Sequence, residues 1–472
     1  MVLKNISQLE QMIVMGSGGK LDDMVDEKKI SPELQAKAVK IANSIRSTDI
    51  DLIFSNSKKL RDHAILDIVQ ALIEVSSEEL NLPLPNYFCL QKLVELAVEN
   101  MHYRMRIVWK KLWSLLADHF TKAGCHENKR VAVFSIDSLK QLSMKFLELD
   151  ELSNYHFQKE FLKPFEIMAK TKSRLVREYV VGILCNMVAI RAHNIKSGWK
   201  SILTVFGQQA SLASEEPIVH TSFQMLTTMN NQYLHLIAPN FFGDYIQAVL
   251  TFCVLKQNTD TFTKAIDLIR TSADKLSEGK LCELADGPND SKIFKGAITQ
   301  HYEKWFSIVN SLVYAVNHTK DNTRKLALSS LFKILKAYGH LFDSQLWEML
   351  YRQSLCKLFI KMFKPIVEND KNEDSSDWLL TTCFKTLHKL ITLYTKFSSC
   401  VEFLLHEIFQ ILEAALLSDN ETLGTFGMTA FGTLLQKNSS KFTESDWTRM
   451  ISSLTTVLRK NTPHHIYSLK VP

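Results

Sequence analysis

Glycine and proline are both scarce in this chain. It has 15 glycines and 10 prolines among 472 residues, which is about half the usual share of each. Folds made of many short strands joined by tight turns need both residue types. The shortage therefore argues against a β-sandwich, a barrel or a propeller, and it favours long helices.

Cysteine pairs and long apolar runs are missing as well. The eight cysteines are scattered and form no C-x-x-C pair, as is usual in a reducing compartment. No signal peptide opens the sequence, and the longest apolar run, from Tyr179 to Ile190, is too short to cross a bilayer. We therefore expect a cytosolic protein, or one peripheral to a membrane from the cytosolic side. A net charge of +6 over this length does not indicate nucleic acid as a partner.

Motifs for catalysis and cofactor binding are also absent from the sequence. There is no phosphate-binding G-x-x-x-x-G-K loop, no G-x-G-x-x-G after a strand and no G-x-S-x-G nucleophile elbow. His126-Glu127 and His406-Glu407 begin like zinc-binding helix motifs, but neither has a second histidine at the required spacing. We therefore predict no catalytic residue, no metal and no cofactor, and we do not expect this chain to be an enzyme by itself.

What the chain does have is a recurring helical pattern. Apolar residues recur at steps of three and four along most of it. Similar helix starts at Val131, Val176 and Val219 lie 45 and 43 residues apart, the length of a HEAT or armadillo unit. Pro32 is suited to a first helical position, and Thr443-x-x-Asp446 has capping-box spacing. The pattern predicts an all-α fold, an α-solenoid of HEAT/armadillo-like repeats. A compact multi-helix bundle is the alternative, because the repeat signal is degenerate.

Breaks in the pattern suggest how the chain is divided. Leu82-Pro83-Leu84-Pro85-Asn86 reads as a short stiff connector, and Gly279, Gly287 and Pro288 mark a hinge loop. The divisions that we expect are a first region at 1–86, central helical repeats at 87–276, a hinge at 277–292, C-terminal helical repeats at 293–466 and a tail at 467–472.

In several segments the exact residue sequence is more informative than the helical periodicity. They are VLKNISQLEQMIVMGSG at 2–18, VFSIDSLKQLSMKFLELDEL at 133–152, NYHFQKEFLKPFE at 154–166, NIKSGWKSILTVF at 194–206 and KFTESDWTRM at 441–450. In this order they resemble the region downstream of the exchange domain in large trans-Golgi Arf guanine-nucleotide exchange factors, the brefeldin A-inhibited (BIG) family. The resemblance covers nearly the whole chain and is strongest from 87 to 206, with Lys196 where the family signature has arginine. It begins within a helix, so residues 1–86 would be a truncated start of the first downstream homology region.

The resemblance implies a regulatory function. The family's exchange domain inserts a glutamate toward the nucleotide of Arf, and its Phe-Arg-Leu-Pro-Gly-Glu signature does not occur in this sequence. For this chain the resemblance implies roles in autoinhibition, in recruitment to the Golgi membrane and in binding of activated Arf- or Rab-type small GTPases. The implied partners also include the exchange domain of the full-length protein, and a homodimer through N-terminal regions outside this sequence is allowed. The implied location is cytoplasmic and peripheral at the trans-Golgi network.

Two other functional readings remain open. One is a Golgi scaffold relative that shares these regions and has no working exchange domain. The other is an unrelated importin-like helical-repeat protein, which would need a strongly one-signed concave surface. Sequence upstream of Met1 would separate the first of these from an exchange factor.

One helix is the best candidate for a contact surface. Residues 104–120 place a predicted buried stripe on one face, made of Met105, Val108, Trp109, Leu112 and Leu116. The candidate membrane- or GTPase-binding residues are Arg104, Arg106, Lys110, Lys111 and Trp113. Clustered cations gain roughly 1 kcal/mol each near an anionic leaflet, and tryptophan suits a membrane interface. The alternative is that the cations only solvate the helix and that Trp113 lies in the core. Trp199, by contrast, is predicted to be structural, because Gly198 before it permits close packing of neighbouring helices.

Overall fold

The computed structural model describes most of the chain. The described residues are 1–16, 32–44, 47–148, 157–212, 216–254, 259–279, 281, 291–318, 321–358, 376–417 and 421–461. Within these ranges every regular element is a helix and no strand is present, so the all-α prediction is confirmed. The chain divides into two compact units, Met1–Leu226 and Thr227–Pro472.

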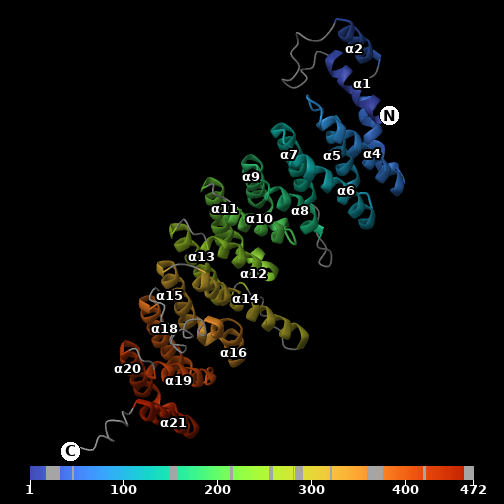
Figure 1. The fold of residues 1–472 in the computed structure, drawn as a ribbon. Helices are drawn as coiled ribbons and strands as arrows, with labels where there is room; N and C mark the ends of the chain where they lie inside the picture. Colours follow the sequence, from blue (N-terminus) through green and yellow to red (C-terminus); the bar gives the residue numbers. More distant parts are fainter. Residues whose placement is uncertain are drawn as a thin grey trace, which may run out of the picture. The chain divides into compact units, whose positions relative to one another are not determined.

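Unit 1 is a stack of helix pairs in two layers (Figure 1). One layer consists of α4 (Asp62–Leu80), α6 (Arg106–Gly124), α8 (Phe157–Met168) and α10 (Trp199–Leu212), each packed on the next. The other layer consists of α5 (Phe88–Met101), α7 (Lys129–Phe146) and α9 (Arg174–Arg191). The unit starts with α1 (Val2–Gly16), α2 (Pro32–Ser44) and α3 (Ser47–Ser55), and it ends within α11 (Glu216–Thr228).

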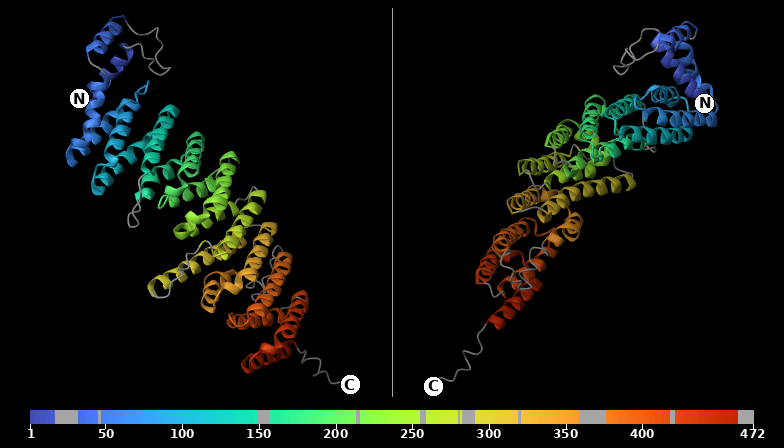
Figure 2. Two further views of the ribbon diagram at one scale, coloured as in Figure 1. Left: turned by 180° about the vertical axis from the view of Figure 1, so that it is seen from behind. Right: turned by 45° about the horizontal axis from the view of Figure 1, so that its top comes forward.

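Unit 2 repeats the same arrangement. In one layer α13 (Thr259–Ser277), α15 (Asp321–Tyr338), α18 (Ser376–Phe397) and α20 (Glu421–Asn438) pack one on the next (Figure 2). Of the other helices, α12 (Leu234–Cys253) packs on α13, α14 (Ser291–His318) on α15 and α19 (Phe403–Leu416) on α20. Helix α16 (Ser344–Leu350) packs on α14, and α21 (Glu444–Asn461) packs on α19. Both units therefore bury apolar stripes by stacking, as helical repeats must.

The repeat period is visible in the hydrogen bonds between equivalent helices. Side chains of one pair bond to side chains of the next pair at nearly constant sequence separation. Examples are His119 with Ser76, Tyr179 with Asp137 and Asn438 with Thr395, which lie 43, 42 and 43 residues apart. This separation is that of a HEAT or armadillo unit. The α-solenoid prediction is confirmed for each unit.

Helix starts follow the capping chemistry expected from the sequence. Helix α2 begins at Pro32, with Glu33 in its first turn. At the start of α21 the Asp446 carboxylate accepts a hydrogen bond from the Thr443 backbone N–H at 3.0 Å. The Thr443 hydroxyl in turn accepts one from the Asp446 N–H at 3.2 Å. This reciprocal pair satisfies two backbone donors that a helix start otherwise leaves unpaired.

The junction before α10 shows why its sequence is distinctive. The buried Gln158 side chain accepts a hydrogen bond from the Lys196 N–H at 2.8 Å and donates one to the Asn194 carbonyl at 3.0 Å. A Cβ on Gly198 would lie only 3.0 Å from a methyl carbon of Leu162 on α8. Trp199 follows and is fully buried. The prediction that Trp199 is a core residue is confirmed, and the junction acts as a clip between consecutive repeats.

The domain divisions expected from the sequence remain predictions. Most of the hinge at 277–292 and all of the tail at 467–472 lie outside the described residues.

Candidate interaction surface

The turn between α5 and α6 is held in place by one arginine. The Arg104 side chain is only 5% exposed. Its guanidinium donates to the Leu60 and Ser57 carbonyls at 2.7 and 2.9 Å and pairs with the Asp62 carboxylate at 3.0 Å. Its Nε donates to the Asn100 side chain at 2.8 Å. Arg104 therefore fastens this turn to the preceding helix pair, and it is a structural residue of the surface around it.

Three large apolar side chains project at this place, two from the turn itself and one from the start of α6. Tyr103, Met105 and Ile107 are 65%, 70% and 74% exposed. The prediction that Met105 belongs to the buried stripe is wrong, because α6 begins one residue later and Met105 precedes it with a non-helical backbone. The rest of the stripe, Val108, Trp109, Leu112 and Leu116, is buried as predicted.

The first two turns of α6 add exposed cations to this turn. Arg106, Lys110 and Lys111 are all exposed. Arg106 and Lys110 are four residues apart, so they lie on one row of the helix, with Ile107 and Lys111 on the adjacent row. The only acidic residue of α6 is Asp118, two turns further on.

Trp113 lies in the core rather than on this surface. It is 3% exposed and stacks on Phe161 of α8, with ring centroids 3.7 Å apart. Of the five candidate residues, Arg106, Lys110 and Lys111 are therefore accessible, whereas Arg104 and Trp113 hold the fold around them. We define the basic corner as Tyr103, Met105, Arg106, Ile107, Lys110 and Lys111.

Metal-ligand groups and reactive thiols are two features that would indicate chemistry at the described residues. These residues contain no group of His, Cys, Asp and Glu side chains that could hold a metal ion. Burial raises the pKa of the Cys89 and Cys253 thiols, which disfavours the nucleophilic thiolate. Within the same described residues no helix is both apolar enough and long enough to cross a membrane.

The chain is similar to several known proteins. Residues 145–228, which include the clip before α10, match a family model described as Mon2/Sec7/BIG1-like, HDS. The brefeldin A-inhibited guanine nucleotide-exchange protein 1 of Mus musculus is 33% identical over 429 residues, covering 88% of this chain and 22% of that protein. Protein 2 of the same name from Arabidopsis thaliana is 31% identical, covering 96% of this chain and 27% of that protein. The chain thus spans about a quarter of the length of these relatives.

The similarity of this chain to solved structures is weak. A circular tandem repeat protein covers 97% of this chain and 98% of its own, at 13% identity and a TM-score of 0.31. A likeness of that size supports no inference about function.

Proposed function

This chain is a BIG-family region, related over most of its length to the brefeldin A-inhibited guanine nucleotide-exchange proteins, and we propose that it is a regulatory region of a large Arf exchange factor. In this proposal it works by binding, and a separate domain of the full-length protein performs nucleotide exchange. The observation that carries the proposal is the basic corner, which combines projecting apolar side chains with exposed cations. The partner that we assign to it is the anionic cytosolic face of a Golgi membrane.

The chemistry of the basic corner suits a lipid surface. Tyr103, Met105 and Ile107 protrude, so they can enter the interfacial zone of a leaflet, where apolar side chains leave water. Arg106, Lys110 and Lys111 then lie close to the headgroups, and each cation contributes about 1 kcal/mol near an anionic leaflet. The Arg104 network fixes the backbone of the turn, so little conformational entropy is lost on binding.

Membrane binding would place the linked exchange domain beside its substrate. The relatives are named as guanine nucleotide-exchange proteins, and the sequence lacks the signature of the exchange domain. We propose that the region controls when and where exchange occurs, through the membrane, through Arf- or Rab-type GTPases and through contact with its own exchange domain. Its location in this proposal is the cytosolic face of the trans-Golgi network.

Neutralising two cations of the basic corner should weaken membrane binding. In an Arg106→Gln, Lys110→Gln variant two contributions of about 1 kcal/mol are lost, which corresponds to a roughly thirtyfold weaker partition onto anionic vesicles. Both side chains are exposed, so the fold should be retained. Flotation with vesicles of phosphatidylcholine and phosphatidylserine measures the partition, and circular dichroism checks the helices.

Two exposed cations of α7, beyond the C-terminal end of α6, provide a matched control. Lys129 and Arg130 are exposed at the start of α7, next to the last turn of α6. A Lys129→Gln, Arg130→Gln variant loses the same net charge and should bind vesicles like the parent. Equal weakening by both variants would mean that net charge alone matters, and intact binding by the first variant would place the membrane contact elsewhere.

A further inference from the structure

Three helices that follow one another in one layer of unit 2, α15, α18 and α20, carry mostly positive charge. The acidic residues of α15, α18 and α20 are Asp321, Asp377 and Glu421, and each lies in the first turn of its helix. After these first turns the charged residues are all basic. They are Arg324, Lys325, Lys333, Lys336, Lys385, Lys389, Lys396 and Lys437. The preceding helix of the layer, α13, differs because it carries three aspartates along its length.

Three of these lysines form a cluster. Lys389 of α18 is half-buried, and its ammonium group lies 5.6 Å from the centre of the Phe332 ring on α15. Burial lowers the pKa of Lys389, and the charges of Lys333 and Lys385 lower it further. No carboxylate of the described residues forms an ion pair with any of the three. Among the described residues the positive charge of this cluster is therefore not neutralised, and an anionic partner would relieve the repulsion.

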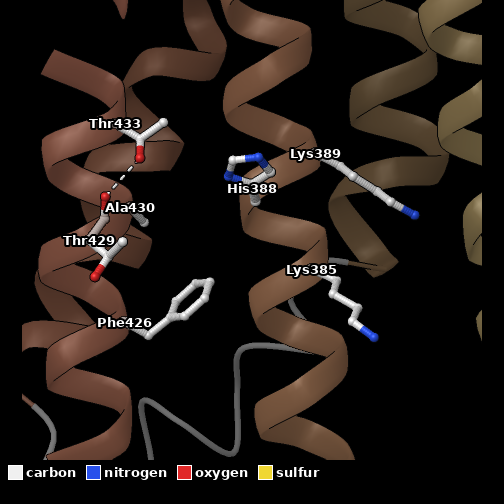
Figure 3. A pocket seen from close by; sticks show the side chains of 7 residues that line it. All are labelled: Lys385, His388, Lys389, Phe426, Thr429, Ala430 and Thr433. Atoms are coloured by element: carbon white, nitrogen blue, oxygen red, sulfur yellow. Dashed lines mark hydrogen bonds between the residues drawn. The ribbon is translucent and has the colours of Figure 1, made fainter. Parts of the chain in front are cut away.

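An apolar pocket adjoins the cluster. It has a volume of about 510 Å³ and lies between α18 and α20. Figure 3 shows Phe426 and Ala430 of α20 on one side of it and His388 of α18 on the other. The stems of Lys385 and Lys389 line it too, and both side chains extend away from α20. The recess thus lies on the α20 side of α18, and the two ammonium groups lie on its other side, near α15. The apolar lysine stems join the two.

We propose that this pocket and the lysine cluster bind an acidic amphipathic segment of a partner protein. An apolar side chain of the segment would enter the recess between α18 and α20, and its carboxylates would pair with Lys333, Lys385 and Lys389. Helical surfaces commonly recognise partners in this way, with apolar anchors in a groove and charges beside it. A recess accepts a side chain, whereas membrane insertion requires protruding groups such as those of the basic corner. The inference goes beyond the proposed membrane contact, because it concerns a different unit and a different partner.

Fluorescence anisotropy with the full chain tests the proposal. The probe is a labelled 16-residue helical peptide with leucine and phenylalanine on one face and glutamate on the other. It should bind saturably, and a peptide with glutamine in place of every glutamate should not. A Lys385→Gln, Lys389→Gln variant should bind the acidic peptide about tenfold more weakly. Thr429→Trp, which fills the pocket from the exposed side of α20, should weaken it by a similar factor.

The control variant removes two positive charges from the same unit. Lys264 and Arg352 lie outside the cluster, and each pairs with a carboxylate of its own helix at 2.7 Å. A Lys264→Gln, Arg352→Gln variant should bind the peptide like the parent. The proposal is overturned if the acidic peptide does not bind, or if the cluster variant and the control variant bind it equally well. It is also overturned if the cluster variant loses binding to anionic vesicles while peptide binding is unchanged, because the partner would then be a lipid surface.

Discussion

Replacing Trp199 with alanine should lower the free energy of unfolding of its repeats by about 3–5 kcal/mol, the usual cost of deleting a buried tryptophan side chain. Trp199 is fully buried, and its indole N–H has no hydrogen-bond partner among the described residues. The loss therefore comes from burial and from the cavity left behind. In a helical repeat array this loss is felt mainly by the adjoining repeats.

Hydrogen exchange followed by mass spectrometry locates the effect. Peptides from α8 to α10 should exchange more than about a hundredfold faster in the variant, since each 1.4 kcal/mol is a factor of ten. Peptides from α19 to α21 should not change. Trp447→Ala is the control, because Trp447 is 36% exposed on α21 and its removal should have a much smaller effect. A Trp199→Ala protein with unchanged exchange at α8 to α10 would show that the residue does not support this junction.

Acidification should destabilise unit 1 through His119. This side chain is 4% exposed, and its Nε2 lies 2.9 Å from the Ser76 hydroxyl. Burial, with a smaller contribution from the charge of Lys122, lowers the pKa of His119 from 6.5 to about 4. Between pH 6.5 and 4, His119 is therefore mostly neutral in the folded state and mostly protonated in the unfolded chain. The stabilisation is complete above pH 6.5 and is lost as the pH falls toward 4, by about 3 kcal/mol in total.

A His119→Gln variant isolates this effect from other titrating groups. Glutamine can keep a hydrogen bond to Ser76 and does not titrate, so carboxylates common to both proteins cancel in the comparison. The difference in unfolding free energy between parent and variant, from denaturant titrations at several pH values, should be constant above pH 6.5. Between pH 6.5 and 4 it should shift by about 3 kcal/mol in favour of the variant. A difference that stays constant over the whole range would show that His119 titrates normally in the folded protein.

The repeat architecture could be predicted because it depends on short-range patterns. Scarce glycine and proline, helical periodicity and helix starts about 43 residues apart are all present in the sequence. The clip before α10 was partly predictable, since Gly198 and Trp199 imply close packing. Gln158, which bonds to the 194–198 segment from 36 or more residues away, could not be assigned, because nothing local to glutamine indicates which backbone groups it will meet.

The candidate sites were harder to predict for the same reason. Periodicity placed Met105 in the buried stripe, but the helix begins after it, and one residue at a helix start decides burial. Periodicity also left Trp113 undecided, because its burial depends on Phe161 in the next repeat. The lysine cluster brings together Lys333 and Lys389, 56 residues apart in the sequence. Only the packing of α15 against α18 shows that their charges act on each other.

The proposed division between binding and catalysis can be tested in one assay. Release of labelled GDP from an Arf-type GTPase is measured on anionic vesicles with this chain alone, and flotation of the same sample shows whether the chain is on the membrane. We expect the chain to be bound to the vesicles and GDP release to stay at its spontaneous rate. Release well above that rate, or a chain that does not float with the vesicles, would contradict the account.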